Sequence, residues 1–140
     1  MAGLRQIRTS QRTAAILIRW PAGKSQEQIR EIEMEFVGTW HIYEMEMWDE
    51  DYFNMEVQAY IEINKKGLGN FQFGLVSGYL DGEVAEFDNK KRFEFTWEGQ
   101  DENDPVSGSG WLKTGEENSL EGKIKLHLGD SSKFRARRAG

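Results

Sequence analysis

Acidic side chains are concentrated in four short polar segments of the chain, DEDYFN, LDG, QDENDP and GDSS, which contain no Lys or Arg. Carboxylates gathered at one place could select a cationic or amine-bearing ligand by charge, or they could coordinate a hard cation such as Ca²⁺. They could also be a solvated rim, because Asp is a common turn residue. The sequence leaves all three interpretations open. The residues concerned are Asp49, Glu50, Asp51, Asp81, Asp101, Glu102, Asp104 and Asp130.

Other residue types that carry chemistry give weaker signals. The two histidines, His41 and His127, alternate with apolar neighbours and are expected to face solvent, whereas a haem-binding barrel needs an inward His. Glu44 and Glu46 could perform acid–base chemistry only if they pointed inward, but they alternate with methionines and are expected to face out. The chain has no Cys, no nucleophile-elbow motif and no EF-hand spacing. We therefore predict no catalytic residue, no metal ligand and no cofactor.

Composition and charge narrow the class of protein. The length of 140 residues suits one domain, and the absence of Cys fits a reducing cytoplasm, which is the expected location. Residues 1–24 hold five basic side chains and no acid, so we expect a basic, disordered tail, with a membrane-surface or partner-binding arm as the alternative. Residues 25–140 carry 13 basic and 24 acidic side chains, a balance that disfavours nucleic acid binding. No segment approaches the ~20 apolar residues of a membrane span.

The elements that must position the acidic segments are mainly strands. Ser25 and Gln28 have the spacing of a capping box, so a short helix is predicted over residues 25–35. The segments NMEVQAYIEI, RFEFTWE and LEGKIKLHL alternate apolar and polar residues as half-buried strands do. They place Met55, Val57, Ala59, Ile61, Ile63, Phe93, Phe95, Trp97, Leu120, Ile124, Leu126 and Leu128 inward. In VSGSGWL the pattern does not decide whether Trp111 or the glycines face inward.

The strand count predicts the fold class. A first strand near Trp40 and further strands near 69–79, 83–88, 105–113 and 133–138 bring the total to eight, joined by short turns. We predict a single domain over 25–140, an all-β, eight-stranded antiparallel up-and-down barrel that the helix of residues 25–35 plugs at one end, with a two-sheet sandwich as the alternative. In such a meander alternate turns lie at opposite ends, which brings the four acidic segments to one end.

The first strand changes phase along its length. Trp40 and Ile42 share one face, whereas Met45 and Met47 belong to the opposite phase. If all four side chains face inward, an extra residue must be inserted near Tyr43 and Glu44. A β-bulge makes such an insertion and bends the strand at a barrel corner.

At this point the chain resembles the calycins, the group of lipocalins, fatty-acid-binding proteins and avidins. The resemblance lies in Gly38-Thr39-Trp40, the short helix before it and the basic last strand SKFRARR. It implies that Trp40 packs at the closed end under an Arg of the last strand. Arg135, Arg137 and Arg138 are available for this role, and we predict that Arg137 fills it. The chain also looks like small bacterial proteins that share MWDxDY, FTWEG and HLGD stretches. This second resemblance implies no activity.

The calycin resemblance also implies that the acidic turns surround an open mouth. The ligand-binding residues predicted on this basis are Trp48, Phe73, Phe95, Trp97, Asp49, Asp51, Asp101, Asp104 and Asp130. The first functional hypothesis is non-enzymatic binding of a small, partly apolar ligand, which could be cationic. The second is a protein-interaction module whose barrel is filled by its own side chains. The third is a small barrel enzyme of the isomerase or cyclase type.

Overall fold

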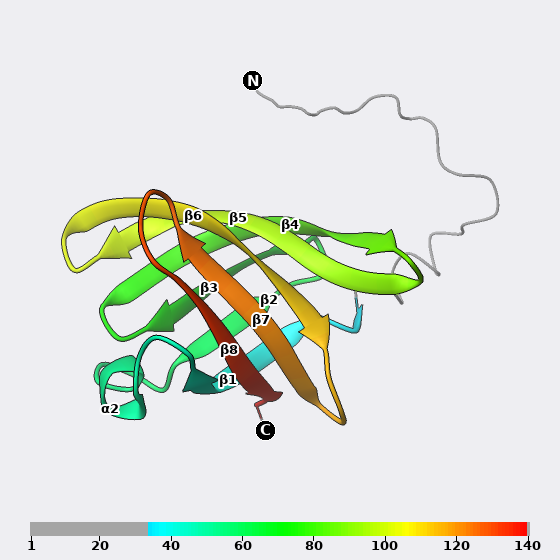
Figure 1. Cartoon of the computed structure of the whole chain (residues 1–140), viewed down its shortest axis with the longest axis horizontal. Helices are drawn as coiled ribbons and strands as arrows, with labels where there is room; N and C mark the ends of the chain where they lie inside the picture. The colour runs from blue at the N-terminus through cyan, green and yellow to red at the C-terminus, as the bar shows by residue number, and fades with distance from the viewer. Residues whose placement is uncertain (1–33, 140) are drawn as a thin grey trace, which may run out of the picture. The chain divides into compact units, whose positions relative to one another are not determined.

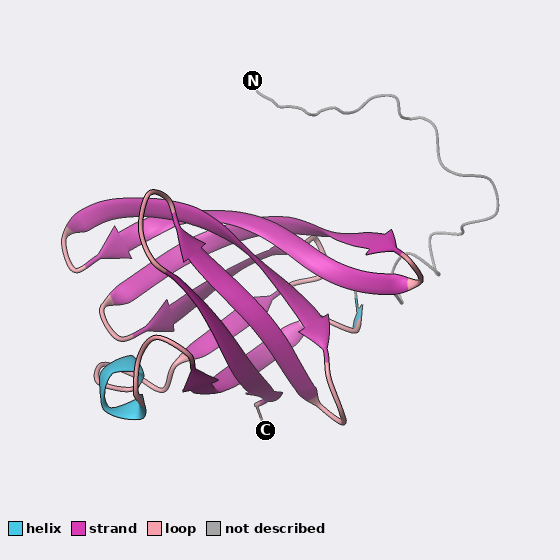
Figure 2. Cartoon of the chain, in the orientation of Figure 1, coloured by secondary structure: helices cyan, strands magenta, loops and turns pink. Residues whose placement is uncertain are grey.

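The computed structural model describes residues 34–139, which form a closed barrel of eight antiparallel strands in sequence order (Figure 1). The strands are β1 (Gly38–Met45), β2 (Tyr60–Ile63), β3 (Leu68–Phe73), β4 (Val76–Phe87), β5 (Lys90–Asp101), β6 (Asp104–Thr114), β7 (Ser119–Leu126) and β8 (Ser131–Arg138), with the helix α2 (Glu50–Phe53) between β1 and β2. Each strand pairs with its sequence neighbour, and β8 pairs with β1. The predicted fold class is confirmed, and strands and short loops make up most of the described chain (Figure 2). The predicted tail (1–24) and residues 25–33 of the predicted helix lie outside the described residues.

The interior of the barrel is filled by apolar side chains that alternate with outward polar ones along each strand. The most buried of them come from all eight strands and from the segments before β1 and around α2. They include Phe36, Trp40, Ile42, Phe53, Ile61, Phe71, Phe73, Leu80, Phe93, Phe95, Trp97, Leu112, Leu120, Ile124, Phe134 and Ala136. The space enclosed by Ile42, Phe71 and Phe134 has no room for a water molecule. The aromatic rings contact each other directly; those of Phe71 and Trp97 are 5.0 Å apart, edge to face.

The predicted bulge in the first strand is present. The register of β1 against β8 shifts between Ile42 and Glu44. As a result both Ile42 and Met45 are buried, although three positions separate them. Glu44 and Glu46 lie on the outside, as the alternation predicted.

One predicted turn is wrong. The segment LDG lies inside β4, and the chain reverses instead at residues 74–75. Gly74 has a φ of +58°, which a residue with a side chain rarely adopts, and the ring of Tyr52 lies against it. Gly82 of LDG serves a different purpose: it leaves space for the side chains of Phe93 and Phe95 on the neighbouring strand. Asp81 therefore belongs to a strand and not to a turn.

Two predicted strand ends are also wrong. Met55 and Val57 were expected to point inward, but they are exposed because the chain forms α2 and a loop before β2 begins at Tyr60. Leu128 was expected in the barrel and is 93% exposed. It lies after the end of β7 in the turn to β8, with a φ of +61°.

Candidate functional site

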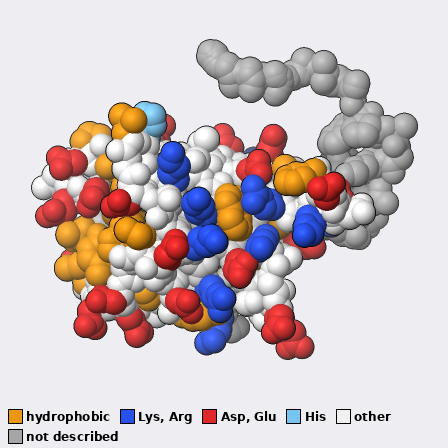
Figure 3. Space-filling model, viewed as in Figure 1, with side chains coloured by type: hydrophobic (Ala, Val, Ile, Leu, Met, Phe, Trp, Pro, Cys, Tyr) orange, Lys and Arg blue, Asp and Glu red, His pale blue; other side chains and the backbone are white. Residues whose placement is uncertain are grey.

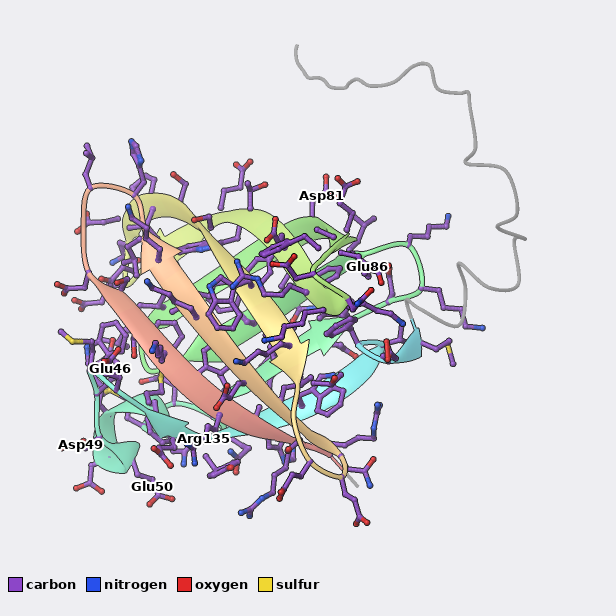
Figure 4. The ribbon with its side chains drawn as sticks, turned by 45° about the vertical axis from the view of Figure 1, so that its right-hand side comes forward. Glu46, Asp49, Glu50, Asp81, Glu86 and Arg135 are labelled. Carbon is purple, nitrogen blue, oxygen red and sulfur yellow. The ribbon has the colours of Figure 1, made fainter. Side chains whose placement is uncertain are left out.

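Three of the acidic segments lie at the same end of the barrel, as predicted from the alternation of turns. DEDYFN, QDENDP and GDSS belong to the β1–β2, β5–β6 and β7–β8 connections, which lie at the left in Figure 1. We call the side chains of these segments the acidic end. They are Asp49, Glu50, Asp51, Asp101, Glu102, Asp104 and Asp130. Asp81 does not belong with them: in Figure 4 it lies on β4, well apart from Asp49 and Glu50.

The acidic end is closed, and this corrects the expectation of an open mouth. Phe53 of α2 is only 2% exposed and belongs to the core. The ring of Trp48 lies 5.0 Å from that of Phe73 and 6.1 Å from that of Tyr52. The backbone N–H of Leu75 donates to the Tyr52 hydroxyl at 3.3 Å, which ties α2 to the β3–β4 turn. The β1–β2 connection therefore covers the interior at this end.

The predicted ligand-binding residues separate into two groups. Phe73, Phe95 and Trp97 are core residues with 1–4% exposure, so they occupy the space that was expected to hold a ligand. The predicted aspartates are exposed or partly exposed at the acidic end. Asp49 has a clear local role, because its Oδ1 accepts from the backbone N–H of Tyr52 at 3.2 Å and caps α2. Within residues 34–139 no three His, Asp or Glu side chains are placed to hold a metal ion.

The opposite end of the barrel is closed by Trp40, which is 1% exposed. Its indole N–H donates to the Phe36 carbonyl at 2.9 Å. The guanidinium over its ring belongs to Arg138, at 4.1 Å, and donates to the Val37 carbonyl at 2.8 Å. Gly38 beside it has a φ of +130°, which a residue with a side chain rarely adopts, and a Cβ there would displace the Arg138 guanidinium.

The choice of Arg137 for the contact with Trp40 is therefore wrong. Trp40 is the direct register partner of Arg138, so the two side chains share one face of the β1–β8 ladder. Arg137 is on the other face, where its guanidinium lies 4.1 Å from the centre of the Tyr43 ring.

The interior of the described barrel contains no acid or base. Ser132 is the one fully buried polar side chain within residues 34–139. Its hydroxyl accepts from the Met47 backbone N–H at 3.1 Å and donates to the Lys133 carbonyl at 2.9 Å. His41 and His127 are exposed, as predicted.

Tyr60 is a half-buried group with a shifted pKa on the outer surface. Burial raises the pKa of its hydroxyl, and the charges of Glu62 and Tyr79 raise it further. The hydroxyl donates to the Asn70 side chain at 2.7 Å, which favours its neutral form.

The outer surface of β6–β8 carries a cluster of basic side chains that the sequence analysis missed. On these three strands the outward positions hold six basic residues and one acidic residue, Glu121. Figure 3 shows Lys and Arg side chains gathered over these strands. We call this surface the basic face; its members are Lys113, Lys123, Lys125, Lys133, Arg135 and Arg137. The alternation in KIK and KFRAR was visible in the sequence, but only the pairing of the strands brings the two segments together.

Trp111 lies beside the basic face. It points outward, because Leu112 next to it is fully buried, and this resolves the ambiguity of VSGSGWL. The Arg92 guanidinium lies 4.5 Å from the centre of its ring, and the Lys113 ammonium lies 5.9 Å away. Such contacts hold a partly exposed indole in one orientation.

No family model matches the chain, and neither the curated proteins nor the solved structures contain a match. The described residues include no helix that is long and apolar enough to cross a membrane.

Proposed function

We propose that this protein is a non-enzymatic interaction module that binds a partner protein through its outer surface. The observation that carries the proposal is the filled interior. The space enclosed by Ile42, Phe71 and Phe134 has no room for a water molecule, whereas pockets for drug-sized ligands have volumes of about 300–1,000 Å³. Both ends are covered, by Trp40 and by α2 with Trp48.

The chemistry of the interior also supports a binding role. Catalysis inside a barrel needs an acid, a base or a nucleophile that faces the substrate. The inward positions of the described strands hold apolar side chains, and the buried Ser132 hydroxyl makes hydrogen bonds to the backbone on both sides. Glu44 and Glu46, the carboxylates that an enzyme of this type would need inside, lie outside.

A second candidate function is the binding of a small cationic ligand on the acidic end, outside the lumen. It is favoured by the gathering of exposed carboxylates around Trp48, which is only half-buried. Cations are attracted both to carboxylates and to the face of an indole ring. In this version the ligand would lie over α2 and not beneath it.

The calycin resemblance supports the same architecture. The contact of Arg138 with Trp40 matches the arrangement that the resemblance implies for the closed end. We propose on this basis that the barrel is of calycin type, with a filled lumen in place of the ligand cavity.

The proposal is tested by measuring whether small apolar molecules enter the barrel. The full chain is titrated with benzene and with palmitate, and binding is followed by calorimetry and by tryptophan emission. We expect no uptake by the unaltered protein. Phe71→Ala is the matched positive control, because an apolar cavity of the size of a removed Phe side chain admits benzene.

Uptake of palmitate by the unaltered protein would overturn the proposal and restore the lumen-binding hypothesis. Choline tests the second candidate. If choline binds to the unaltered protein, binding should weaken in the variant Glu50→Gln/Asp51→Asn. It should persist in Glu116→Gln/Glu117→Gln, which removes two charges in the β6–β7 turn at the opposite end.

A further inference from the structure

We propose that the basic face is the docking surface of the module and that its partner is a short acidic segment of another protein. This inference rests on the proposed function, and it names the surface and the chemistry of the partner. Three observations carry it: the unpaired cations, a pair of lysines placed directly opposite each other, and an aromatic hollow beside them.

The cations of the basic face are largely unpaired. The Lys113 ammonium forms an ion pair with Glu121 at 3.2 Å. The other five basic residues of the face form no ion pair with any carboxylate of residues 34–139. Elsewhere the described barrel is rich in acids, so a negatively charged segment is repelled from most of its surface and attracted to this part.

Lys123 and Lys133 are direct partners in the β7–β8 register. Like charges directly opposite each other destabilise a sheet. Lys123 is also half-buried, which reduces the screening of its charge by solvent. Local arrangements that reduce stability without a structural gain are expected at functional positions. An anion placed between the two ammonium groups would turn the repulsion into attraction.

A hollow of about 560 Å³ adjoins Lys133. Trp111, the register partner of Lys123, lines the hollow with its ring. The charged side chains of the lining are four cations, Arg92, Lys113, Lys133 and Arg135, and three carboxylates, Glu44, Glu46 and Glu121, so cations exceed acids by one. Trp and Arg are the residue types most enriched among those that dominate binding energy at protein interfaces. The hollow is large enough for one or two side chains of a partner.

The geometry favours a peptide over other polyanions. Outward residues of one strand, such as Lys123 and Lys125, recur about every 6.8 Å, and acidic residues at every second position of an extended peptide have the same spacing. The basic face is also short. Asp130 lies beyond one end of it, and Glu116 and Glu117 lie beyond the other. A duplex or a membrane surface would extend over these acids, whereas a short segment would not.

The test uses the full chain and a labelled ten-residue peptide of alternating Glu and Val, with binding followed by fluorescence anisotropy at low salt. The same peptide with Gln in place of Glu is the ligand control. We expect the Glu peptide to bind and its affinity to fall as salt is added. The variant Lys123→Gln/Lys133→Gln should bind roughly tenfold more weakly. The matched control Lys65→Gln/Lys66→Gln, in the β2–β3 turn, should bind like the unaltered protein.

Folding is controlled in the same experiment. Removal of the lysine pair relieves repulsion, so the variant should unfold at a higher urea concentration than the unaltered protein. Weaker binding by a more stable protein supports a docking role and excludes loss of structure as its cause.

Three outcomes would overturn the inference. The first is no binding of the Glu peptide, or equal binding by both double variants. The second is tighter binding of a single-stranded oligonucleotide with the same dependence on Lys123 and Lys133. The third is sedimentation as a dimer that excludes the peptide, which would make a second copy the occupant. None of these outcomes concerns the interior. The inference can therefore fail while the barrel takes up no apolar ligand, and in that case the proposed function stands.

Discussion

The outer surface of the barrel differs sharply between two groups of strands. On β6–β8 the outward positions hold the six cations of the basic face and a single acid. On β2–β5 the outward positions hold mainly acids: Glu62, Asp81, Glu83, Glu94 and Glu98, with Lys90 and Arg92 as the basic residues. Each surface contains one pair of like charges in direct register, Lys123 with Lys133 and Glu83 with Glu94.

The inner surfaces of the same two groups do not differ in this way. Phe71 and Trp97 from the acidic side and Leu112 and Phe134 from the basic side belong to one continuous apolar core. Stability depends mainly on the inward residues, and these are apolar all round the barrel. The outward residues contribute little to stability and can therefore differ in charge. The comparison indicates that the fold supports two surfaces of opposite charge on one common interior.

The largest expected effects come from the interior and should be equal on the two sides. Trp97→Ala beneath the acidic surface and Phe134→Ala beneath the basic face should each lower the free energy of unfolding by about 3–5 kcal/mol. Both side chains are almost completely buried among other large residues. Urea unfolding followed by circular dichroism measures the loss. A loss under only one surface would break the idea of a common core.

An intermediate effect on stability is expected for Arg138, the cation of β8 that lies over Trp40, and not for the cations of β8 that point outward. Arg138→Met removes the guanidinium over Trp40 and its bond to the Val37 carbonyl. It should lower the free energy of unfolding by about 1–2 kcal/mol. Arg137→Met is the matched control, because the Arg137 guanidinium lies over the exposed Tyr43 ring on the outer surface, and a much smaller change is expected. Similar losses in both variants would mean that the contact with Trp40 contributes no more to stability than the contact with Tyr43.

A smaller effect of favourable sign is expected where like charges face each other. Glu83→Lys on the acidic surface and Lys123→Glu on the basic face should each raise the free energy of unfolding by about 0.5 kcal/mol at low salt. Added salt should remove the gain, since both pairs lie at the surface. Thermal unfolding at two salt concentrations checks this. A gain on one surface alone would show that the two like-charge pairs are not equivalent.

The smallest effect is a pH dependence that belongs to the acidic side. The fold raises the pKa of Tyr60 above its ordinary value of 10.0, first through burial and then through Glu62 and Tyr79. Between the unfolded and folded pKa values the unfolded chain binds fewer protons, so stability decreases as pH rises. The contribution is complete below pH 10.0 and is lost as pH rises through the folded value. Tyr60→Phe should flatten this part of the profile, as measured by urea unfolding between pH 9 and 11.5. A decline as steep as in the unaltered protein would assign it to another group.

The sequence predicts the barrel because strand alternation and turn spacing are local properties. The bulge near Tyr43 was predictable for the same reason, since the phase of the inward residues changes along one strand. The exact turn between β3 and β4 was not predictable. From the sequence alone, either Gly74 or Gly82 could be the glycine of a turn. Only tertiary contacts distinguish them: Gly74 in the turn lies against Tyr52, and Gly82 in the strand lies against Phe93 and Phe95.

The candidate site was predictable only in part. Alternate turns brought the carboxylates of the acidic end together as expected. That Phe95 and Trp97 fill the lumen depends on the combined volume of side chains from all strands, which no local pattern contains. The wrong prediction of Arg137, in place of Arg138, as the partner of Trp40 has a similar cause. The bulge adds one residue to β1 and shifts its register against β8, so the residue opposite Trp40 cannot be assigned without the pairing.

The closure of the barrel by β8 has a consequence for synthesis on the ribosome. The Arg138 guanidinium reaches the Val37 carbonyl across 101 positions of the chain, whereas the other ladders join strands that are neighbours in sequence. Until β8 has left the exit tunnel, β1 and β7 each keep an unpaired edge that can pair with other chains. The nascent protein is thus most vulnerable to aggregation after most of its core residues have been made.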